Sequence, residues 1–233
     1  ARAYNAFGSV QYESGDFDGA FDNLQKSLEI TQSLAAQNPA NEEMRRNLST
    51  LLEEIGYVYI SKGEPAAALE QYRKALEIRT RLSADFPLNM DYRNLIAVGY
   101  YNMAEAQNNL GDHKGSLESN RRYAAIAREL AAADPKNAQH KSGIAFGHLR
   151  IGDQLLALGD TAAALSEYRQ ALPLFVKEAE ADPINLWKRA AMTEARTRFA
   201  VALAKAGETA AANEQCAKTV KLMNETPEIT DAY

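Results

Sequence analysis

The chain of 233 residues repeats itself with a period of 48 residues. A glycine followed by an acidic residue occurs five times at this spacing, at Gly15-Asp16, Gly63-Glu64, Gly111-Asp112, Gly159-Asp160 and Gly207-Glu208. A second pattern, Pro-x-Asn, keeps the same spacing and begins at Pro39, Pro87, Pro135 and Pro183. Two independent patterns with one period indicate an internal repeat, in which each structural unit packs only against its neighbours.

Each repeat predicts a pair of helices. In the second unit, Asn41 can cap a helix, and apolar residues then recur at helical spacing as far as Gly63. Gly63 can adopt the left-handed conformation that ends a helix, and Pro65 suits the first turn of the next helix, where its missing N–H needs no partner. Pro87 prevents that second helix from continuing. The pattern therefore predicts two helices per unit and no strand.

The whole chain is accordingly predicted to be an all-α solenoid of about ten helices in antiparallel pairs. We divide it into one array of five units, residues 1–38, 39–86, 87–134, 135–182 and 183–224, and expect residues 225–233 to be an irregular tail. In the last three units we expect helices at Asn89–Leu110, Asp112–Ala133, Asn137–Leu158, Asp160–Ala181, Asn185–Ala206 and Glu208–Asn224. Asp16, Asp112 and Asp160 are expected to be helix caps.

Two columns of small residues indicate how the helices approach each other. One column lies near the start of each second helix, at Ala20, Ala68, Ser116, Ala164 and Ala212. The other lies seven residues before each Gly-acid pair, at Gly8, Gly56, Ala104, Gly152 and Ala200. Small residues let helix backbones come close together. Asn213 replaces the large apolar residue of the other units, which suggests a less buried face near the end of the stack.

Composition and charge narrow the kind of partner. The formal net charge of −5 gives no reason to expect nucleic acid or an anionic membrane as partner. No apolar stretch approaches the roughly 18 residues that cross a bilayer. With a single cysteine, Cys216, the chain can form no internal disulfide, which fits a cytoplasmic protein. Because the chain starts with Ala1, partway through a repeat, we expect a fragment of a longer protein.

These residues resemble the tetratricopeptide repeat, a helix pair with small residues at fixed places and an aromatic residue in the second helix. The second unit carries the pattern at Ile55-Gly56, Tyr59, Gly63, Ala68, Tyr72 and Ala75, and the fourth at Ile151-Gly152, Gly159, Ala164, Tyr168 and Ala171. The third unit departs from it with Ala104, Ser116 and Asn120, and the fifth has Cys216 at the aromatic position. The resemblance covers the chain to about residue 224.

The period of 48 residues exceeds the 34 that are typical of this family. This repeat length, together with the Gly-Asp and Asp-Pro-x-Asn patterns at the ends of the helices, resembles that of repeats attached to bacterial signalling proteins, including serine/threonine kinases. The family resemblance implies a right-handed superhelix whose first helices line a concave groove. It also implies that this groove binds a protein or a peptide.

No residue pattern indicates catalysis, a metal or a cofactor, so we predict a non-enzymatic chain. The three histidines, His113, His140 and His148, do not form the helical pairs that bind metals. Cys216 lies on an apolar stripe and is expected to be a small core residue rather than a nucleophile. Trp187 is expected to pack against the preceding helix, with docking of a partner as the alternative.

The groove is therefore the candidate site. Its expected lining, on the first helices, comprises Asn5, Ser9, Tyr12, Glu53, Tyr57, Tyr101, Asn102, Glu105, Asn108, Asn109, Arg150, Asp153 and Arg198. Asparagine amides can pair with the backbone of an extended peptide, tyrosines add apolar area with a polar tip, and the arginines can hold a carboxylate. A second interpretation stays open, in which these are ordinary solvated residues with tyrosines partly buried between units.

Three functional hypotheses follow. The first is a scaffold that binds a protein or peptide in the groove. The second is a regulatory or sensory region of a larger bacterial signalling enzyme, such as a serine/threonine kinase. The third is self-association through the ends of the solenoid, because a terminal helix leaves an apolar stripe without a neighbour.

Overall fold

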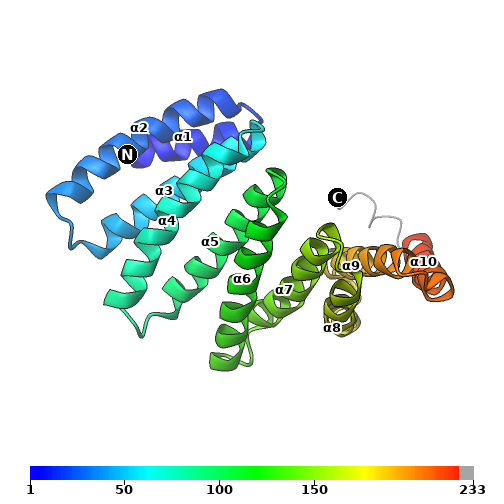
Figure 1. The fold of residues 1–233 in the computed structure, drawn as a ribbon. Coiled ribbons are helices and arrows are strands. Elements are labelled where there is room, and N and C mark those ends of the chain that lie inside the picture. Colours follow the sequence, from blue (N-terminus) through cyan, green and yellow to red (C-terminus); the bar gives the residue numbers. More distant parts are fainter. Residues whose placement is uncertain (226–233) are drawn as a thin grey trace. The chain divides into compact units, whose positions relative to one another are not determined.

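Helices account for nearly all of the described structure. The computed structural model describes residues 1–225, which contain ten α-helices and no strand (Figure 1). The helices are α1 (Arg2–Glu13), α2 (Phe17–Gln37), α3 (Glu42–Ser61), α4 (Pro65–Asp85), α5 (Met90–Asn109), α6 (His113–Ala133), α7 (Ala138–Ala157), α8 (Thr161–Ala181), α9 (Leu186–Lys205) and α10 (Thr209–Glu225). The predicted all-α helix pairs are confirmed, and the expected irregular tail lies outside the described residues except for Glu225, which ends α10.

The Gly-acid pair joins the end of one helix to the beginning of the next. All five glycines of this pair have φ between 74° and 87°, and no other described residue has a positive φ. A side chain in this conformation costs roughly 1–2 kcal/mol, which explains why glycine recurs here. The Asp16 carboxylate then accepts from the Gly19 N–H at 3.0 Å, and Asp160 accepts from the Ala163 N–H at 3.0 Å.

The Pro-x-Asn pattern precedes four of the five first helices, α3, α5, α7 and α9. The Asn41 side chain accepts a hydrogen bond from the Met44 N–H at 2.9 Å, and Asn185 accepts one from Lys188 at 3.2 Å. Asn89 and Asn137 cap their helices in the same way. The asparagines, together with Asp16, Asp112 and Asp160 of the Gly-acid pairs, therefore cap helices and satisfy backbone groups that a helix end leaves without partners, whereas Glu64 makes no such bond.

The columns of small residues are buried where helices of a pair meet. Ala20, Ala68, Ser116 and Ala164 have no exposed surface. Opposite them, Gly56 lies directly beneath the ring of Tyr72, where a Cβ would overlap the ring, and Gly152 lies in the same way beneath Tyr168. Glycine in the first helix therefore makes room for the buried tyrosine of the second helix.

The chain divides into two compact halves, Ala1–Ser119 and Asn120–Tyr233. In the first half, α1 packs against α2, α2 against α3, α3 against α4 and α4 against α5. In the second half, α7 packs against α8, α8 against α9 and α9 against α10. The arrangement of all five repeats in one continuous array stays a prediction.

Two expectations about single residues need correction. Cys216 is exposed and is not a core residue, because on the last helix, α10, no described element covers the face that carries it. Trp187 packs against Phe146 with ring centroids 5.6 Å apart, yet more than half of it stays exposed. Its partner lies on α7, the first helix of the preceding pair, rather than on the neighbouring helix α8.

Candidate functional site

Side-chain contacts join α1 to α3 at two of the predicted groove residues, Asn5 and Tyr12. The Asn5 amide donates to the Glu54 carboxylate, and the Tyr12 and Ser61 hydroxyls lie 3.1 Å apart, so both pairs join α1 to α3. We use the name first-helix face for the residues Asn5, Tyr12, Glu54, Tyr57, Tyr101, Glu105, Asn108 and Asn109. Its helices are linked by side-chain hydrogen bonds as well as by packing, which holds the face in a fixed arrangement.

A buried polar network lies directly beneath this face. Arg79, on α4, is completely buried and forms two parallel hydrogen bonds of 2.8 Å to the Glu53 carboxylate on α3. Arg79 also donates to the Leu95 carbonyl at 3.1 Å. The Asn102 amide of α5 donates to Glu53 Oε1 and to the Tyr57 hydroxyl, both at 2.9 Å. One network therefore ties α3, α4 and α5 together.

This network corrects the expected exposure of Asn102. Its side chain is only 3% exposed and its amide hydrogens are used inside the protein, so it lies below the first-helix face. Burial, together with the nearby Glu53 charge, raises the pKa of Tyr57 to about 12, so the phenol stays neutral at physiological pH. Arg79 was missed by the sequence analysis because it lies on a second helix, outside the expected groove.

The accessible part of the first-helix face is amide-rich, acidic and aromatic. Glu105, Asn108 and Asn109 are exposed, and Tyr12, Tyr57 and Tyr101 are half-buried. Neutral amides and phenols can donate and accept hydrogen bonds, while Glu105 adds a negative charge. The face therefore offers a surface for backbone pairing, apolar contact and attraction of a cation.

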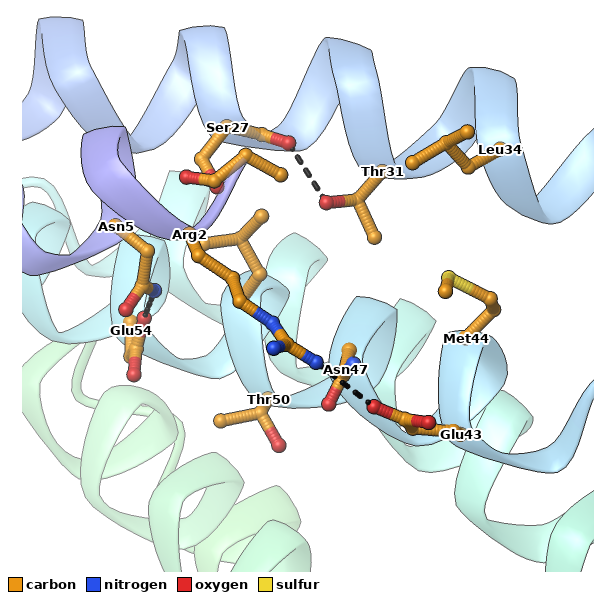
Figure 2. Close-up of a pocket in the computed structure, with 12 residues that line it drawn as sticks. Arg2, Asn5, Ser27, Thr31, Leu34, Glu43, Met44, Asn47, Thr50 and Glu54 are labelled. Atoms are coloured by element: carbon orange, nitrogen blue, oxygen red, sulfur yellow. Dashed lines mark hydrogen bonds and ion pairs between the residues drawn. The ribbon is translucent and has the colours of Figure 1, made fainter.

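A pocket of about 470 Å³ opens at the beginning of α1, between α1, α2 and α3 (Figure 2). Arg2 pairs with Glu43 at 3.2 Å on one side of it, and Asn5 contacts Glu54 on another. Leu34 and Met44 add apolar surface. Burial raises the pKa of Glu54, against the hydrogen bond from Asn5 and with the help of the neighbouring Glu53 charge.

In the second half of the chain, residues 120–233, two of the predicted groove residues, Asp153 and Arg198, lie in an ion-pair cluster. Arg198, on α9, pairs with Asp153 of α7 and with Glu194 of its own helix. The Tyr168 hydroxyl donates to Asp153 at 2.8 Å. Burial raises the pKa of Asp153, against the attraction of Arg198. Arg198 therefore already has carboxylate partners, while Arg150 of α7 is half-buried nearby.

Other candidate chemistry is sparse in the described part of the chain. No three His, Cys, Asp or Glu side chains of residues 1–225 gather as a metal ion would require. His148 Nδ1 lies 2.6 Å from the Glu167 carboxylate, in a pair that joins α7 to α8. None of the described helices has the length and apolar character needed to cross a membrane.

Comparisons with known proteins agree with this architecture. Residues 48–87 match the family model of the tetratricopeptide repeat. A search of curated proteins finds no match. Each of three solved structures below shares 15–16% sequence identity with the chain, a level that shows the fold alone.

The apo form of RapI has a TM-score of 0.76, with 97% of this chain and 71% of that chain covered. The TPR-like repeats of a putative kinesin light chain from Podosopora anserina have a TM-score of 0.71, covering 97% and 96%. A signal transduction ATPase with a tetratricopeptide repeat sensor, from Pyrococcus horikoshii, has a TM-score of 0.67, covering 99% and 31%. The chain is thus an all-α helical-repeat protein, and its helix pairs are TPR-like repeats.

Proposed function

We propose that the protein is an interaction scaffold, which binds an extended segment of a protein partner on its first-helix face. The observation that carries this proposal is the accessible row of Tyr57, Tyr101, Glu105 and Asn109 above a fully bonded network. Because the hydrogen bonds of Arg79, Glu53 and Asn102 hold α3, α4 and α5 in fixed positions, little rearrangement of these helices opposes binding. The TPR-like fold, which is consistent with a scaffold, supports the same proposal.

The chemistry of the face favours a peptide that carries a basic side chain. Glu54 and Glu105 supply carboxylates on α3 and α5. The half-buried tyrosines can cover the aliphatic part of a lysine or stack on an arginine, since aromatic faces attract cations. Asn108 and Asn109 extend the face along α5, where amide groups suit an extended backbone.

Selection from a random peptide display library against the folded chain tests this function. We expect the selected peptides to be enriched in Lys or Arg. A variant with Tyr101→Ala, Glu105→Ala and Asn109→Ala should lose at least about 30-fold in affinity, which corresponds to about 2 kcal/mol.

The matched control changes three exposed residues of α4, with Glu70→Ala, Lys74→Ala and Glu77→Ala. This variant should bind as the unchanged protein does. Equal affinities of the two variants, both folded by circular dichroism, would move the binding site away from the first-helix face.

A regulatory region of a larger signalling enzyme is the second candidate. The likeness to the repeat sensor of a signal transduction ATPase favours it, since this chain spans 31% of that protein. The suggestion that this enzyme is a kinase rests only on the length of the repeats and on the patterns at the ends of their helices. The complete gene product decides between the candidates: a catalytic domain in the same chain supports regulation, and a chain made of repeats alone excludes it.

A further inference from the structure

A small pocket lies between α1 and α3, with a residue of α2 as its floor. Its volume is about 90 Å³, far below the roughly 300–1,000 Å³ of pockets that hold a small molecule, so it has the size for the end of one side chain. We call it the α1–α3 pocket, and its lining includes Tyr12 and Glu13 of α1, Leu24 of α2, and Glu54, Tyr57 and Val58 of α3. Three of these residues, Tyr12, Glu54 and Tyr57, also belong to the first-helix face.

The pocket exists because Leu24 is smaller than its counterparts in two later repeats. The residues 48 and 144 positions after Leu24 are Tyr72 and Tyr168, both buried. The Tyr168 hydroxyl donates to Asp153 of α7 at 2.8 Å, and the position equivalent to Asp153 in the first repeat is Ser9 of α1. Leu24 has no group that reaches so far, which leaves the space that Ser9 also lines.

The floor of the pocket is apolar and its walls are aromatic. Leu24 and Val58 are almost completely buried, and the rings of Tyr12 and Tyr57 are half-buried above them. The Tyr57 hydroxyl accepts a hydrogen bond from the Asn102 amide at 2.9 Å, which holds this ring in place. Such walls can cover the methylene groups of a long side chain, and tyrosine faces attract a cation.

Two carboxylates of the pocket have no cationic partner among residues 1–225. Glu13 is exposed and forms no ion pair with any residue of that range. Glu54 accepts from the Asn5 amide through Oε2, while Oε1 receives no hydrogen bond from residues 1–225 (Figure 2). The charge of the adjacent Glu53, in contrast, is matched by Arg79. The pocket therefore carries negative charge that a cation from a partner would neutralise.

The geometry at Glu54 favours lysine over arginine. A guanidinium binds a carboxylate best through two parallel hydrogen bonds, as Arg79 binds both oxygens of Glu53. At Glu54 the Asn5 amide already occupies one oxygen. An ammonium group is a compact charge that needs only one open oxygen, and its four-carbon stem suits an apolar floor.

We propose that the α1–α3 pocket binds the ammonium end of a lysine side chain of a protein partner, with Glu54 and Glu13 as its carboxylate partners. This inference rests on the function proposed above and adds a preference for lysine at one position of the bound segment. Between α3 and α5 the counterparts of Leu24 and Glu54 are Tyr72 and the neutral Asn102, both buried. The lysine therefore fixes the register of the bound segment on α1 and α3.

An NMR titration of the whole isotope-labelled chain with capped lysine, Nα-acetyl-lysine methylamide, tests the pocket directly. We expect millimolar binding, with the largest chemical-shift changes at Tyr12, Glu54 and Tyr57. The norleucine analogue lacks the ammonium group and should bind at least about ten times more weakly, because hydrogen bonds between charged groups are stronger than other contacts of this size. The arginine analogue should bind at least about three times more weakly than capped lysine. Arginine or norleucine analogues that bind as tightly as capped lysine would overturn the proposal.

A matched pair of substitutions at Leu24 tests the role of the space. Leu24→Tyr should fold, because Gly8 lies beneath Leu24 as Gly56 lies beneath Tyr72. It should weaken the binding of capped lysine at least about tenfold, because the larger ring fills the pocket. Leu24→Met conserves volume and should bind as the unchanged chain does. Equal affinities of these two variants, both folded by circular dichroism, would show that capped lysine does not occupy the pocket.

A second pair of variants tests the carboxylate. Glu54→Gln keeps the shape of the side chain and removes its charge, so it should weaken the binding of capped lysine at least about tenfold. Glu70→Gln, on the exposed side of α4, is the control and should leave binding unchanged. Equal affinities of Glu54→Gln and Glu70→Gln would also overturn the proposal.

The pocket and the proposed function can fail separately. Peptides selected from the display library are titrated against the unchanged chain and the Leu24→Tyr variant. If they bind both equally well on the first-helix face, the lysine pocket is wrong and the proposed function stands. If capped lysine binds in the pocket but the library yields no peptide, the preference of the pocket for lysine stands and the proposed function is wrong.

Discussion

Arg79 is the largest completely buried side chain of the described residues, and its charge is matched within the protein. Glu53 takes two of its hydrogen bonds, and the Leu95 carbonyl and the Ser49 hydroxyl take others. A buried charge that loses its partner is strongly destabilising, whereas the intact pair can be close to neutral. The network therefore fixes the positions of α3, α4 and α5 more than it adds to stability.

Glu53→Ala should lower the free energy of unfolding by about 3–5 kcal/mol, because it leaves the Arg79 guanidinium buried without its carboxylate. Urea denaturation measures this loss. The double variant Glu53→Leu with Arg79→Met should lose clearly less than the sum of the two single changes. Asp85→Ala, which removes the exposed partner of Arg45, should cost at most about 1 kcal/mol. Equal losses for Glu53→Ala and Asp85→Ala would contradict the importance of the buried pair.

The pKa of Glu54 gives a pH dependence with a defined sign. Burial raises it above the ordinary value of 4.5, so the folded state holds this proton more tightly than the unfolded state does. Stability therefore falls as pH rises from 4.5 through the folded pKa. Glu54→Gln removes this loss, so its melting temperature relative to the wild type should increase between pH 4 and pH 7.

Glu70 is the control with the opposite sign. The hydrogen bond and charge of Lys74 lower the pKa of Glu70 below 4.5, so its contribution is present above that pH and is lost as pH falls through the folded pKa. Glu70→Gln should therefore lose relative stability over the same rise in pH. Identical pH profiles for the two variants would show that the surroundings of Glu54 are not as described.

Single-residue environments were the least predictable feature of the sequence. Asn102 lies on the expected helix, yet its side chain is buried and bonded inside the protein. Arg198 stays partly exposed but already pairs with Asp153 and Glu194. Helical spacing places a residue on a face, but whether it is bonded there depends on the neighbouring helix. Arg79 shows the same limit, since its partner Glu53 lies 26 residues away in the chain.

At the scale of helices, close approach of the two members of a pair depends on glycine. Gly56→Ala should destabilise the protein by about 1–3 kcal/mol, because the new methyl group overlaps the buried Tyr72 ring. The usual gain from alanine in a helix, roughly 1 kcal/mol, is too small to offset this clash. Gly99→Ala is the control, because its Cβ would lie 3.2 Å from the Leu76 side chain, and it should be near neutral.

Thermal unfolding of both variants checks this expectation. Adding Tyr72→Leu to Gly56→Ala should recover part of the loss, relative to Tyr72→Leu alone, because the smaller side chain leaves space. A Gly56→Ala variant as stable as Gly99→Ala would contradict the proposed packing role of the glycine.

The helices themselves were predictable because several local signals agree. Asn41 marks the beginning of a helix and Gly63 marks its end, and the apolar residues between them recur at the helical period. The helix α8 also runs from Thr161 to Ala181 as expected, although Pro173 lies inside it. The exposure of Cys216 was not predictable from its stripe, because burial requires a covering element as well as an apolar position.

At the scale of the whole molecule, some residues recur in every repeat and others change from one repeat to the next. Caps, turns and small residues recur every 48 residues and build the same helix pair each time. The first-helix face changes from repeat to repeat, with Tyr57 and Glu105 at equivalent positions. In the function that we propose, specificity for a partner belongs to the variable residues, while the repeated ones maintain the fold.

Mapping a selected peptide on the protein by NMR tests the central claim most directly. In a titration of the isotope-labelled chain, the largest chemical-shift changes should fall on α3 and α5, around Tyr57, Tyr101, Glu105 and Asn109. The exposed side of α4, around Glu70, Lys74 and Glu77, should change little. Shift changes concentrated on that side of α4, with α3 and α5 unaffected, would contradict binding on the first-helix face.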